Sequence, residues 1–275
     1  MVRTTLFISL LALGLVVAGC GSGSETANPT ADERFAKAMA LYDKGDYLEA
    51  INEFTVITLQ YQGSQHASDA QYYLAECRYN REEYLLAAFE YGVMKRSYPA
   101  SPRAADAQYK LAMSYYRLSP PSSLDQKYTR KAIDEFQTFI EYYPTNPLAV
   151  DAATKIRELD GKLAKKVYDA AQQYALLERY KSALQYYDDV IDQYHDSDYA
   201  PLAWLDKIQL LIDRKRYPEA QTEMTRFLTR YPNSVLRGRA DALQDRLTKE
   251  MKSAPAEKSG GTASIPPGGP GTPAQ

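Results

Sequence analysis

The sequence predicts an all-α fold, a solenoid of five helix–turn–helix repeats closed by a C-terminal capping helix. One observation is an alanine that recurs five times, at Ala50, Ala87, Ala132, Ala183 and Ala220. Four residues after each alanine comes a large side chain: Phe54, Tyr91, Phe136, Tyr187 or Met224. Eleven residues after each comes a tyrosine, at Tyr61, Tyr98, Tyr143, Tyr194 and Tyr231. Nine residues further on alanine returns, at Ala70, Ala107, Ala152, Ala203 and Ala240. Such a fixed spacing indicates repeated structural units rather than biased composition.

The repeat length and residue types resemble the tetratricopeptide repeat. The step from Ala50 to Ala87 is 37 residues, a little longer than the usual tetratricopeptide length of about 34. A small residue in one column lets two helices approach closely, and a large one beside it fills the space. The segment Lys44-Gly45-Asp46 has the composition of a turn between the two helices of the first repeat.

Each repeat can be assigned in order from helical spacing and helix-breaking residues. Repeat one pairs a helix from about residue 33 with one over 47–61, and repeat two covers about 68–98, ended by Pro99. Repeat three is interrupted by eight inserted residues near 118–126, where Pro120 and Pro121 exclude helix. A long helix is predicted over 148–178, with a bend allowed at Gly161. The remaining predicted helices are 180–194, 199–214, 218–231 and a capping helix over 237–251.

The two ends of the chain differ from the middle. Residues 1–19 read as a signal peptide, with Arg3 before an apolar run that is short for a membrane span. Val17-Ala18-Gly19-Cys20 resembles the lipobox of bacterial lipoproteins, and this resemblance implies a mature chain that starts at a lipidated Cys20. Residues 20–32 are predicted to be a flexible tether, 33–251 the solenoid with halves of about 33–145 and 146–251, and 252–275 a disordered Gly/Pro-rich tail.

Composition excludes several classes of function. The chain carries 33 basic and 35 acidic residues, so no basic field argues for nucleic-acid binding. Cys20 and Cys77 cannot form a disulfide framework, and two distant histidines do not make a metal site, so no metal or soluble cofactor is expected beyond the lipid on Cys20. Cys77 is expected to be a buried free thiol. The sequence contains no phosphate-binding glycine loop or nucleophile motif, and a non-enzymatic protein is predicted.

Two columns of aromatic residues are candidates for a substrate-peptide groove on the first helices of repeats one to three. The columns are Phe35, Tyr72 and Tyr109, and Tyr42, Tyr79 and Tyr116, accompanied one turn earlier by Asp69 and Asp106. The two columns are seven residues apart, which places them on one helix face. These rings and hydroxyls could hold an extended or helical peptide rich in aromatics, or could pack between neighbouring repeats. The corresponding face of the C-terminal half, with Tyr168, Gln172, Leu205 and Gln209, breaks the pattern.

The order of lipobox, tether and five repeats resembles the BamD family of outer-membrane assembly lipoproteins. Leu124-Asp125-Gln126 is similar to an insertion in that family, and the stretch 151–164 is similar to its long connecting helix. The resemblance implies a periplasmic, lipid-anchored subunit of the β-barrel assembly machine at the outer membrane, which the glycine at position 21 also favours. It implies that the N-terminal repeats receive unfolded outer-membrane proteins and the C-terminal repeats dock the barrel subunit BamA, beside other machine subunits.

The chain departs from the family at two places, and other functions stay open. His195 stands where the family has proline, and Tyr186 and Tyr187 replace expected basic residues, which affects the details of partner contact. A pilotin or scaffold lipoprotein for secretin or type IV pilus assembly would share the lipobox and repeats but would lack the long helix. A soluble periplasmic coordinator of cell-wall synthesis with Tol proteins would lack the lipid. An enzyme acting on peptidoglycan would need a cleft with paired carboxylates.

Overall fold

The structure, a computed structural model, describes residues 28–253, and residues 1–27 and 254–275 are not described. The predicted signal peptide, Cys20, most of the predicted tether and nearly all of the predicted tail therefore lie outside the described residues. The described part is built from helices with no strand, which confirms the predicted all-α fold.

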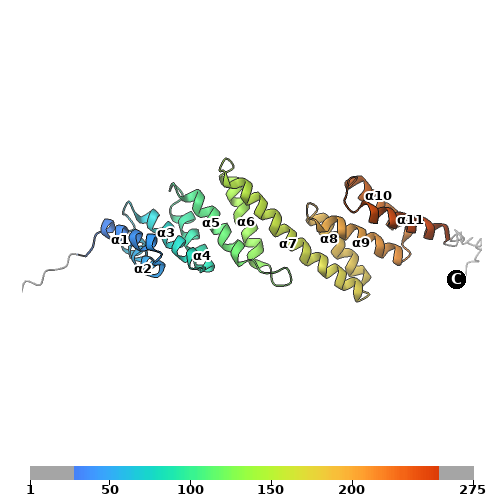
Figure 1. Ribbon diagram of the computed structural model, residues 1–275, viewed down its shortest axis with the longest axis horizontal. Helices are drawn as coiled ribbons and strands as arrows, with labels where there is room; N and C mark the ends of the chain where they lie inside the picture. Colours follow the sequence, from blue (N-terminus) through green and yellow to red (C-terminus); the bar gives the residue numbers. More distant parts are fainter. Residues whose placement is uncertain (1–27, 254–275) are drawn as a thin grey trace, which may run out of the picture. The chain divides into compact units, whose positions relative to one another are not determined.

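The helices follow one another as hairpins (Figure 1). They are α1 Ala31–Lys44, α2 Tyr47–Gln60, α3 Ala67–Asn80, α4 Tyr84–Ser97, α5 Ala104–Leu118, α6 Lys127–Tyr142, α7 Leu148–Leu176, α8 Tyr180–Gln193, α9 Tyr199–Asp213, α10 Tyr217–Arg230 and α11 Arg237–Ser253. The chain divides into two compact units, unit 1 up to Ala107 and unit 2 from Gln108 onward. The boundary between these units falls inside α5, earlier in the chain than the division near residue 145 that the sequence suggests.

The columns found in the sequence form the cores of both units. All ten alanines of the two columns are fully buried, with 0% exposure. The large residue that follows four positions after each first-column alanine is also buried, fully so at Phe54, Tyr91, Phe136 and Met224. Within each unit consecutive helices pack on one another, as α1 does on α2 and α7 does on α8. The residues that recur with the repeat period are therefore the ones that fill the space between helices.

The tyrosine column ends the second helix of each hairpin. Tyr61, Tyr98, Tyr143, Tyr194 and Tyr231 are the C-cap residues of α2, α4, α6, α8 and α10. In α2 and α10 the side chain also fixes an earlier part of the chain: the Tyr61 hydroxyl donates to the Pro29 carbonyl at 3.0 Å, and Tyr231 donates to the His195 carbonyl at 3.2 Å. All five tyrosines therefore stand at helix ends, and those of α2 and α10 also make hydrogen bonds to an earlier segment.

Four hairpins share one tight turn. Its central residue has a left-handed backbone at Gly45, Glu82, Glu178 and Lys215, with φ between 57° and 82°. In each turn its N–H donates to the carbonyl three residues earlier, and the next N–H donates to the carbonyl five residues before it, as in a Schellman motif. Only one of the four is glycine, and a residue with a side chain costs about 1 kcal/mol in this conformation.

A column of glutamates that the sequence analysis missed joins the two helices within four hairpins. Glu53, Glu90, Glu135 and Glu223 occupy the same position of the second helix, three residues after the first-column alanine. Their carboxylates accept from a side chain of the first helix, donated by Arg34, Gln71, Gln108 and Trp204 at 2.8 to 3.0 Å. In repeat four the position is Tyr186, whose ring stacks on Tyr174 with centroids 5.0 Å apart.

The glutamate of repeat five lies in a buried charged cluster. The Lys207 side chain, on a residue only 9% exposed, contacts Asp188 at 2.6 Å and Glu223 at 3.1 Å. Arg226 also reaches Glu223 at 3.0 Å, and the Trp204 indole donates to it at 2.8 Å. Burial alone would raise the pKa of Glu223, but the bond from Lys207, the Trp204 N–H and the nearby charge of Arg226 together hold the pKa below its usual 4.5.

The inserted segment of repeat three is a fixed loop. Gln126 is buried, and its amide donates to the carbonyls of Pro121 and Leu124 at 2.8 and 2.9 Å. Two lysines of α7 also hold this loop: Lys162 donates to the Ser119 hydroxyl at 2.7 Å and Lys166 to the Leu124 carbonyl at 2.9 Å. The 29-residue helix α7 confirms the predicted long helix and continues through Gly161 without interruption.

Candidate functional site

The predicted groove residues of unit 1 are partly committed to packing. Tyr72 is 6% exposed, and its hydroxyl donates to the Asp106 carboxylate of the following first helix. Arg103 lies over the Tyr72 ring, 4.9 Å from its centroid, and donates to Asp69 at 2.8 Å. Burial and the bond to Asp106 raise the pKa of Tyr72. The two predicted aspartates therefore anchor neighbouring side chains.

The other three predicted aromatic residues of unit 1 are half-buried. Phe35 stacks on His66 with centroids 4.4 Å apart. Tyr42 meets Tyr47 edge-on at 5.7 Å, and Tyr79 meets Tyr84 edge-on at 5.3 Å. Burial raises the pKa of Tyr42 to about 12. These rings are the members of the unit 1 columns that keep surface available for a peptide.

In unit 2 the predicted tyrosines use their hydroxyls between helices. Tyr109 donates to Asp151 at 2.5 Å and Tyr116 donates to Glu158 at 2.6 Å, both acceptors on α7. Tyr168 repeats the arrangement further along, donating to Asp206 of α9 at 2.5 Å. A tyrosine on one first helix thus bonds a carboxylate on the next in both units. Peptide binding along the predicted columns stays a prediction.

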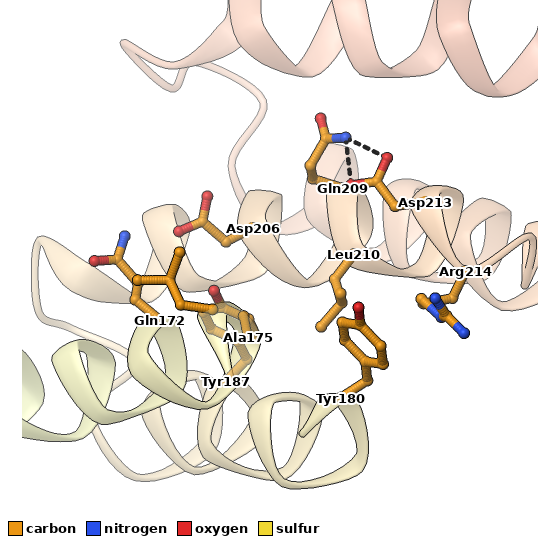
Figure 2. Close-up of a pocket in the computed structure, with 10 residues that line it drawn as sticks. Gln172, Ala175, Tyr180, Tyr187, Asp206, Gln209, Leu210, Asp213 and Arg214 are labelled. Atoms are coloured by element: carbon orange, nitrogen blue, oxygen red, sulfur yellow. Dashed lines mark hydrogen bonds between the residues drawn. The ribbon is translucent and has the colours of Figure 1, made fainter. Parts of the chain in front are cut away.

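The cleft of unit 2 lies between α7, α8 and α9 and has a volume of about 570 Å³ (Figure 2). Apolar and aromatic residues form one part of its lining: Ala175, Leu176, Tyr180, Tyr187 and Leu210. Polar residues form the other part: Gln172, Asp206, Gln209, Asp213 and Arg214. A concave site with an apolar surface and a few polar groups is a typical place for a ligand or a partner segment.

Two glutamines at the same position of consecutive repeats lie along the polar side. Gln172 of α7 and Gln209 of α9 are 37 residues apart in the sequence. The Gln172 amide donates to the Tyr168 hydroxyl at 2.8 Å. The Gln209 amide donates to both Asp213 oxygens at 3.0 Å, as the dashed lines in Figure 2 show. Their side-chain carbonyl oxygens accept no hydrogen bond from the described residues, so each offers an acceptor to a bound group.

The charges around the cleft are unevenly compensated. Asp206 is bound by Arg239 of α11, and Asp213 is bound by Arg246 of α11 at 2.7 Å. Arg214 lies instead over the face of Tyr180, with its guanidinium carbon 4.3 Å from the ring centroid, and forms no ion pair with a described residue. The two acids are therefore neutralised, while the cation that follows Asp213 in the chain is available to an anion.

A smaller pocket of about 160 Å³ surrounds the position where the family resemblance leads us to expect proline. His195 lines it together with Asp160 and Tyr194, and its ring nitrogen lies 3.4 Å from Asp196. Asp160 makes no hydrogen bond or ion pair with a described residue, and burial raises its pKa above the usual 3.8. Of the two tyrosines in place of expected basic residues, Tyr186 stacks on Tyr174 and Tyr187 is buried.

Other features of the described residues bear on function. Helix α4 exposes Leu85, Leu86 and Phe89, to 53, 47 and 61%, which forms an apolar patch on unit 1. Cys77 is a buried free thiol, as predicted, and burial raises its pKa to about 12. Between residues 28 and 253, no three His, Cys, Asp or Glu side chains are grouped as metal ligands. None of the helices in that part combines the length and apolarity needed to cross a bilayer.

Comparison with known proteins finds relatives that match most of the chain. The family model YfiO, described as outer membrane lipoprotein, matches residues 27–209. The outer membrane protein assembly factor BamD of Rickettsia prowazekii (strain Madrid E) is 27% identical over 233 residues, covering 84% of this chain and 93% of that protein.

Solved structures of tetratricopeptide-repeat proteins are also similar, at lower levels. The TPR2AB domain of yeast Sti1 in its complex with pHSP90 is 15% identical with a TM-score of 0.40, covering 81% of this chain and 84% of that one. A thermophilic TPR protein of Thermus thermophilus is 15% identical with a TM-score of 0.33, covering 81% of this chain and 100% of that one. These scores are too low to transfer the geometry or function of those proteins to this chain.

Proposed function

Because the chain belongs to the YfiO family of outer membrane lipoproteins, we propose that it is a non-enzymatic lipoprotein subunit of the β-barrel assembly machine. The observation that carries the proposal is the family match over residues 27–209, joined by 27% identity to an assembly factor over 93% of that factor's length. The helical-hairpin fold supports the proposal, because arrays of this kind present surfaces to protein partners. The protein holds partners together at the outer membrane and carries out no covalent chemistry.

The two units receive different partners in this proposal. Unit 1 binds unfolded outer-membrane proteins through its half-buried aromatic rings, Phe35, Tyr42 and Tyr79, which offer flat apolar surface, with a hydroxyl on each of the two tyrosines. Unit 2 docks the periplasmic part of a BamA-like barrel subunit, with other subunits of the machine bound beside it. The cleft between α7 and α9 and the exposed Leu176 and Leu177 beside it support this assignment.

The membrane attachment is a covalent lipid on Cys20, which holds the protein on the periplasmic face of the outer membrane. Several acyl chains, palmitate among them, make the anchor lasting, since each buried CH₂ contributes about 0.8 kcal/mol. The Cys20→Ala variant is expected to move from the membrane fraction to the soluble periplasmic fraction. Metabolic labelling with radioactive palmitate checks the modification directly, with the unmodified Cys77 providing the internal control. A variant that stays in the membrane and still incorporates palmitate contradicts the anchor.

The assembly role is tested by pulling down the lipidated full chain from detergent-solubilised outer membrane and identifying the proteins that co-purify. Recovery of a large β-barrel protein with periplasmic repeat domains is the expected result. Recovery of a secretin or a pilus component in its place would overturn the assembly role while leaving the fold and the anchor.

The substrate-binding role of unit 1 is tested with the double variant Tyr42→Ala with Tyr79→Ala. This variant is expected to reduce the recovery of unfolded barrel substrate, and unchanged recovery would contradict the role of those rings.

A further inference from the structure

Within residues 28–253, the unit 2 cleft is lined by one cation, Arg214. Arg214 is exposed and stacks on Tyr180, and its guanidinium forms no ion pair with a described residue. Arg179 and Lys181 flank Tyr180 in the sequence, and Lys215 follows Arg214; none of the three forms an ion pair with a described residue. Glu178 precedes Arg179 in the sequence, and it also forms no ion pair with a described residue. Arg214 is therefore the cation among the lining residues, and it has no ion-pair partner in the described part of the chain.

The acids of the cleft do not cancel this charge. Asp206 and Asp213 are each held by an arginine of α11 and by hydrogen bonds from the cleft side chains Tyr168 and Gln209. Because these carboxylates are already compensated, the field near Arg214 favours an incoming anion. A guanidinium stacked on a ring keeps its edge N–H groups free to bind a carboxylate through two parallel hydrogen bonds.

Apolar surface lies next to this cation. Leu176 is 84% exposed and lines the cleft, and Leu177 beside it is 63% exposed. Leu210 and the Tyr180 ring complete this side, as Figure 2 shows for the residues around Arg214. Large apolar side chains exposed at the edge of a concave site gain free energy when a partner covers them, by about 25 cal/mol for each Å² buried.

Gln172 and Gln209 supply hydrogen-bond acceptors for the backbone of a bound peptide. The free carbonyl oxygens of Gln172 and Gln209 can accept from the backbone N–H groups of a segment that crosses from α7 to α9. The spacing of one repeat between them suits an extended segment that continues past both residues, rather than a single small molecule.

We propose that the unit 2 cleft binds an extended partner segment in which an acidic side chain lies next to large apolar side chains. The carboxylate pairs with Arg214, the apolar side chains cover Leu176, Leu210 and Tyr180, and the backbone donates to the two glutamines. This inference deepens the proposed function by naming what unit 2 recognises, and it rests on that function only for the identity of the partner that carries the segment.

The test measures the binding of a fluorescently labelled peptide to the full chain by anisotropy. The probe is acetylated and amidated, about ten residues long, with Leu-Glu-Leu at its centre. Arg214→Gln is expected to weaken binding about tenfold, which corresponds to the loss of one charge-assisted hydrogen-bonded pair. Leu176→Ser is expected to weaken it several-fold. Because the Leu176 side chain is exposed, this variant should fold as the wild-type chain does, which circular dichroism checks.

Arg216→Gln is the matched control, because Arg216 lies two residues away and is already paired with Glu219. It is expected to leave the affinity unchanged. The Leu-Gln-Leu and Ser-Glu-Ser peptides should bind more weakly than Leu-Glu-Leu, and added salt should weaken only the acidic probe. Tighter binding of a probe with a free C-terminal carboxylate and no acidic side chain would overturn the choice of an acidic side chain.

Three further outcomes would overturn the inference itself: equal binding of the Glu and Gln probes, equal effects of the Arg214 and Arg216 variants, or no binding up to about 1 mM peptide. The pull-down separates this failure from failure of the assembly role. A barrel subunit recovered with the wild-type chain, together with no peptide binding, leaves the assembly role and removes this inference. Peptide binding without recovery of a barrel subunit leaves this inference and removes the assembly role.

Discussion

Units 1 and 2 use one position of the repeat in opposite ways. In unit 1 the position is Glu76, which is 7% exposed and accepts from the buried Tyr91 hydroxyl. In the fourth repeat, in unit 2, it is Gln172, which lines an open cleft, while Tyr187, at the position of Tyr91, makes no hydrogen bond with a described residue. With the alanine columns fixing the helices in both units, the carboxylate is used for a buried hydrogen bond, whereas the amide leaves its carbonyl oxygen facing a cleft.

The tie between the two helices of a hairpin differs as well. In repeat two, Gln71 of unit 1 donates to the Glu90 carboxylate at 2.8 Å and also to its backbone carbonyl at 3.0 Å. In repeat five the same positions are Trp204 and Glu223, and the buried Lys207 joins them. The first tie is a neutral donor with two acceptors, whereas the second depends on balanced charges around the largely buried Lys207 and Glu223.

Removing the glutamate should separate these two ties most strongly. Glu223→Ala leaves the Lys207 ammonium with Asp188 alone and the indole N–H without its acceptor, so we expect a loss of about 3 kcal/mol in the free energy of unfolding. Glu90→Ala leaves Gln71 bonded to the backbone carbonyl, and a loss of about 1 kcal/mol is expected. Urea unfolding of both variants measures the difference. Equal losses would show that the buried charge does not distinguish the two hairpins.

The paired tyrosines offer a second comparison. Tyr91→Phe removes the hydroxyl that donates to buried Glu76 and should destabilise the protein by about 1 to 2 kcal/mol. Tyr187→Phe removes a hydroxyl without a hydrogen-bond partner among the described residues and should change stability by less than about 0.5 kcal/mol. Thermal unfolding followed by circular dichroism checks both variants. A larger effect at Tyr187 would reverse the assignment of packing to unit 1.

The hairpin turns allow a comparison at a single backbone angle. Gly45 and Lys215 both have a left-handed φ, 82° and 59°. Lys215→Gly should stabilise the protein by about 1 kcal/mol because a side chain is disfavoured there. Gly45→Ala should destabilise it by a similar amount, since no atom lies within 4 Å of an added Cβ and only the backbone angle opposes the change. Shifts of the urea midpoint in opposite directions are the expected result.

The smallest effect concerns pH and runs in opposite directions at two carboxylates of unit 2. The pKa of Glu223 is held below 4.5 in the folded protein, so its contribution is present above that pH and is lost as the pH falls. The pKa of Asp160 is raised above 3.8, so its ionisation destabilises the fold at neutral pH. Asp160→Asn should therefore raise the melting temperature at pH 7 slightly, and the gain should vanish below about pH 4. The exposed Asp192→Asn is the control and should change nothing at either pH.

Much of the fold can be predicted from the sequence because the residues that fill the space between helices recur at fixed spacing. The alanine columns follow from this regularity, and the inserted loop and the long helix α7 from the two places where the spacing departs from it; each lies where the sequence predicts. The glutamate column is equally regular relative to the alanines, at Glu53, Glu90, Glu135 and Glu223. It was missed because its donors vary between Arg34, Gln71 and Trp204, so the pairing becomes visible only when the two helices are side by side.

The candidate site could be predicted less well. Tyr72 and Tyr109 recur in the sequence as the residues of a binding groove would. Only the structure shows that Asp106 and Asp151 lie within reach of their hydroxyls. The cleft of unit 2 was also hidden, although Gln172 and Gln209 repeat at 37 residues. An interruption of the aromatic pattern in the sequence does not by itself indicate that a cleft is present. Whether such a space exists depends on side chains from three helices at once.

The indole of Trp204 gives the second unit an optical signal of its own. It is the single tryptophan of the chain, 7% exposed, and it is surrounded by Phe227, Tyr231 and the Glu223 carboxylate. Excitation at the red edge of the absorption band, where the 24 tyrosines do not absorb, therefore observes unit 2 alone. Loss of helical ellipticity before any change in this emission would mean that unit 1 unfolds first, a distinction that can be recorded on the unlabelled native chain.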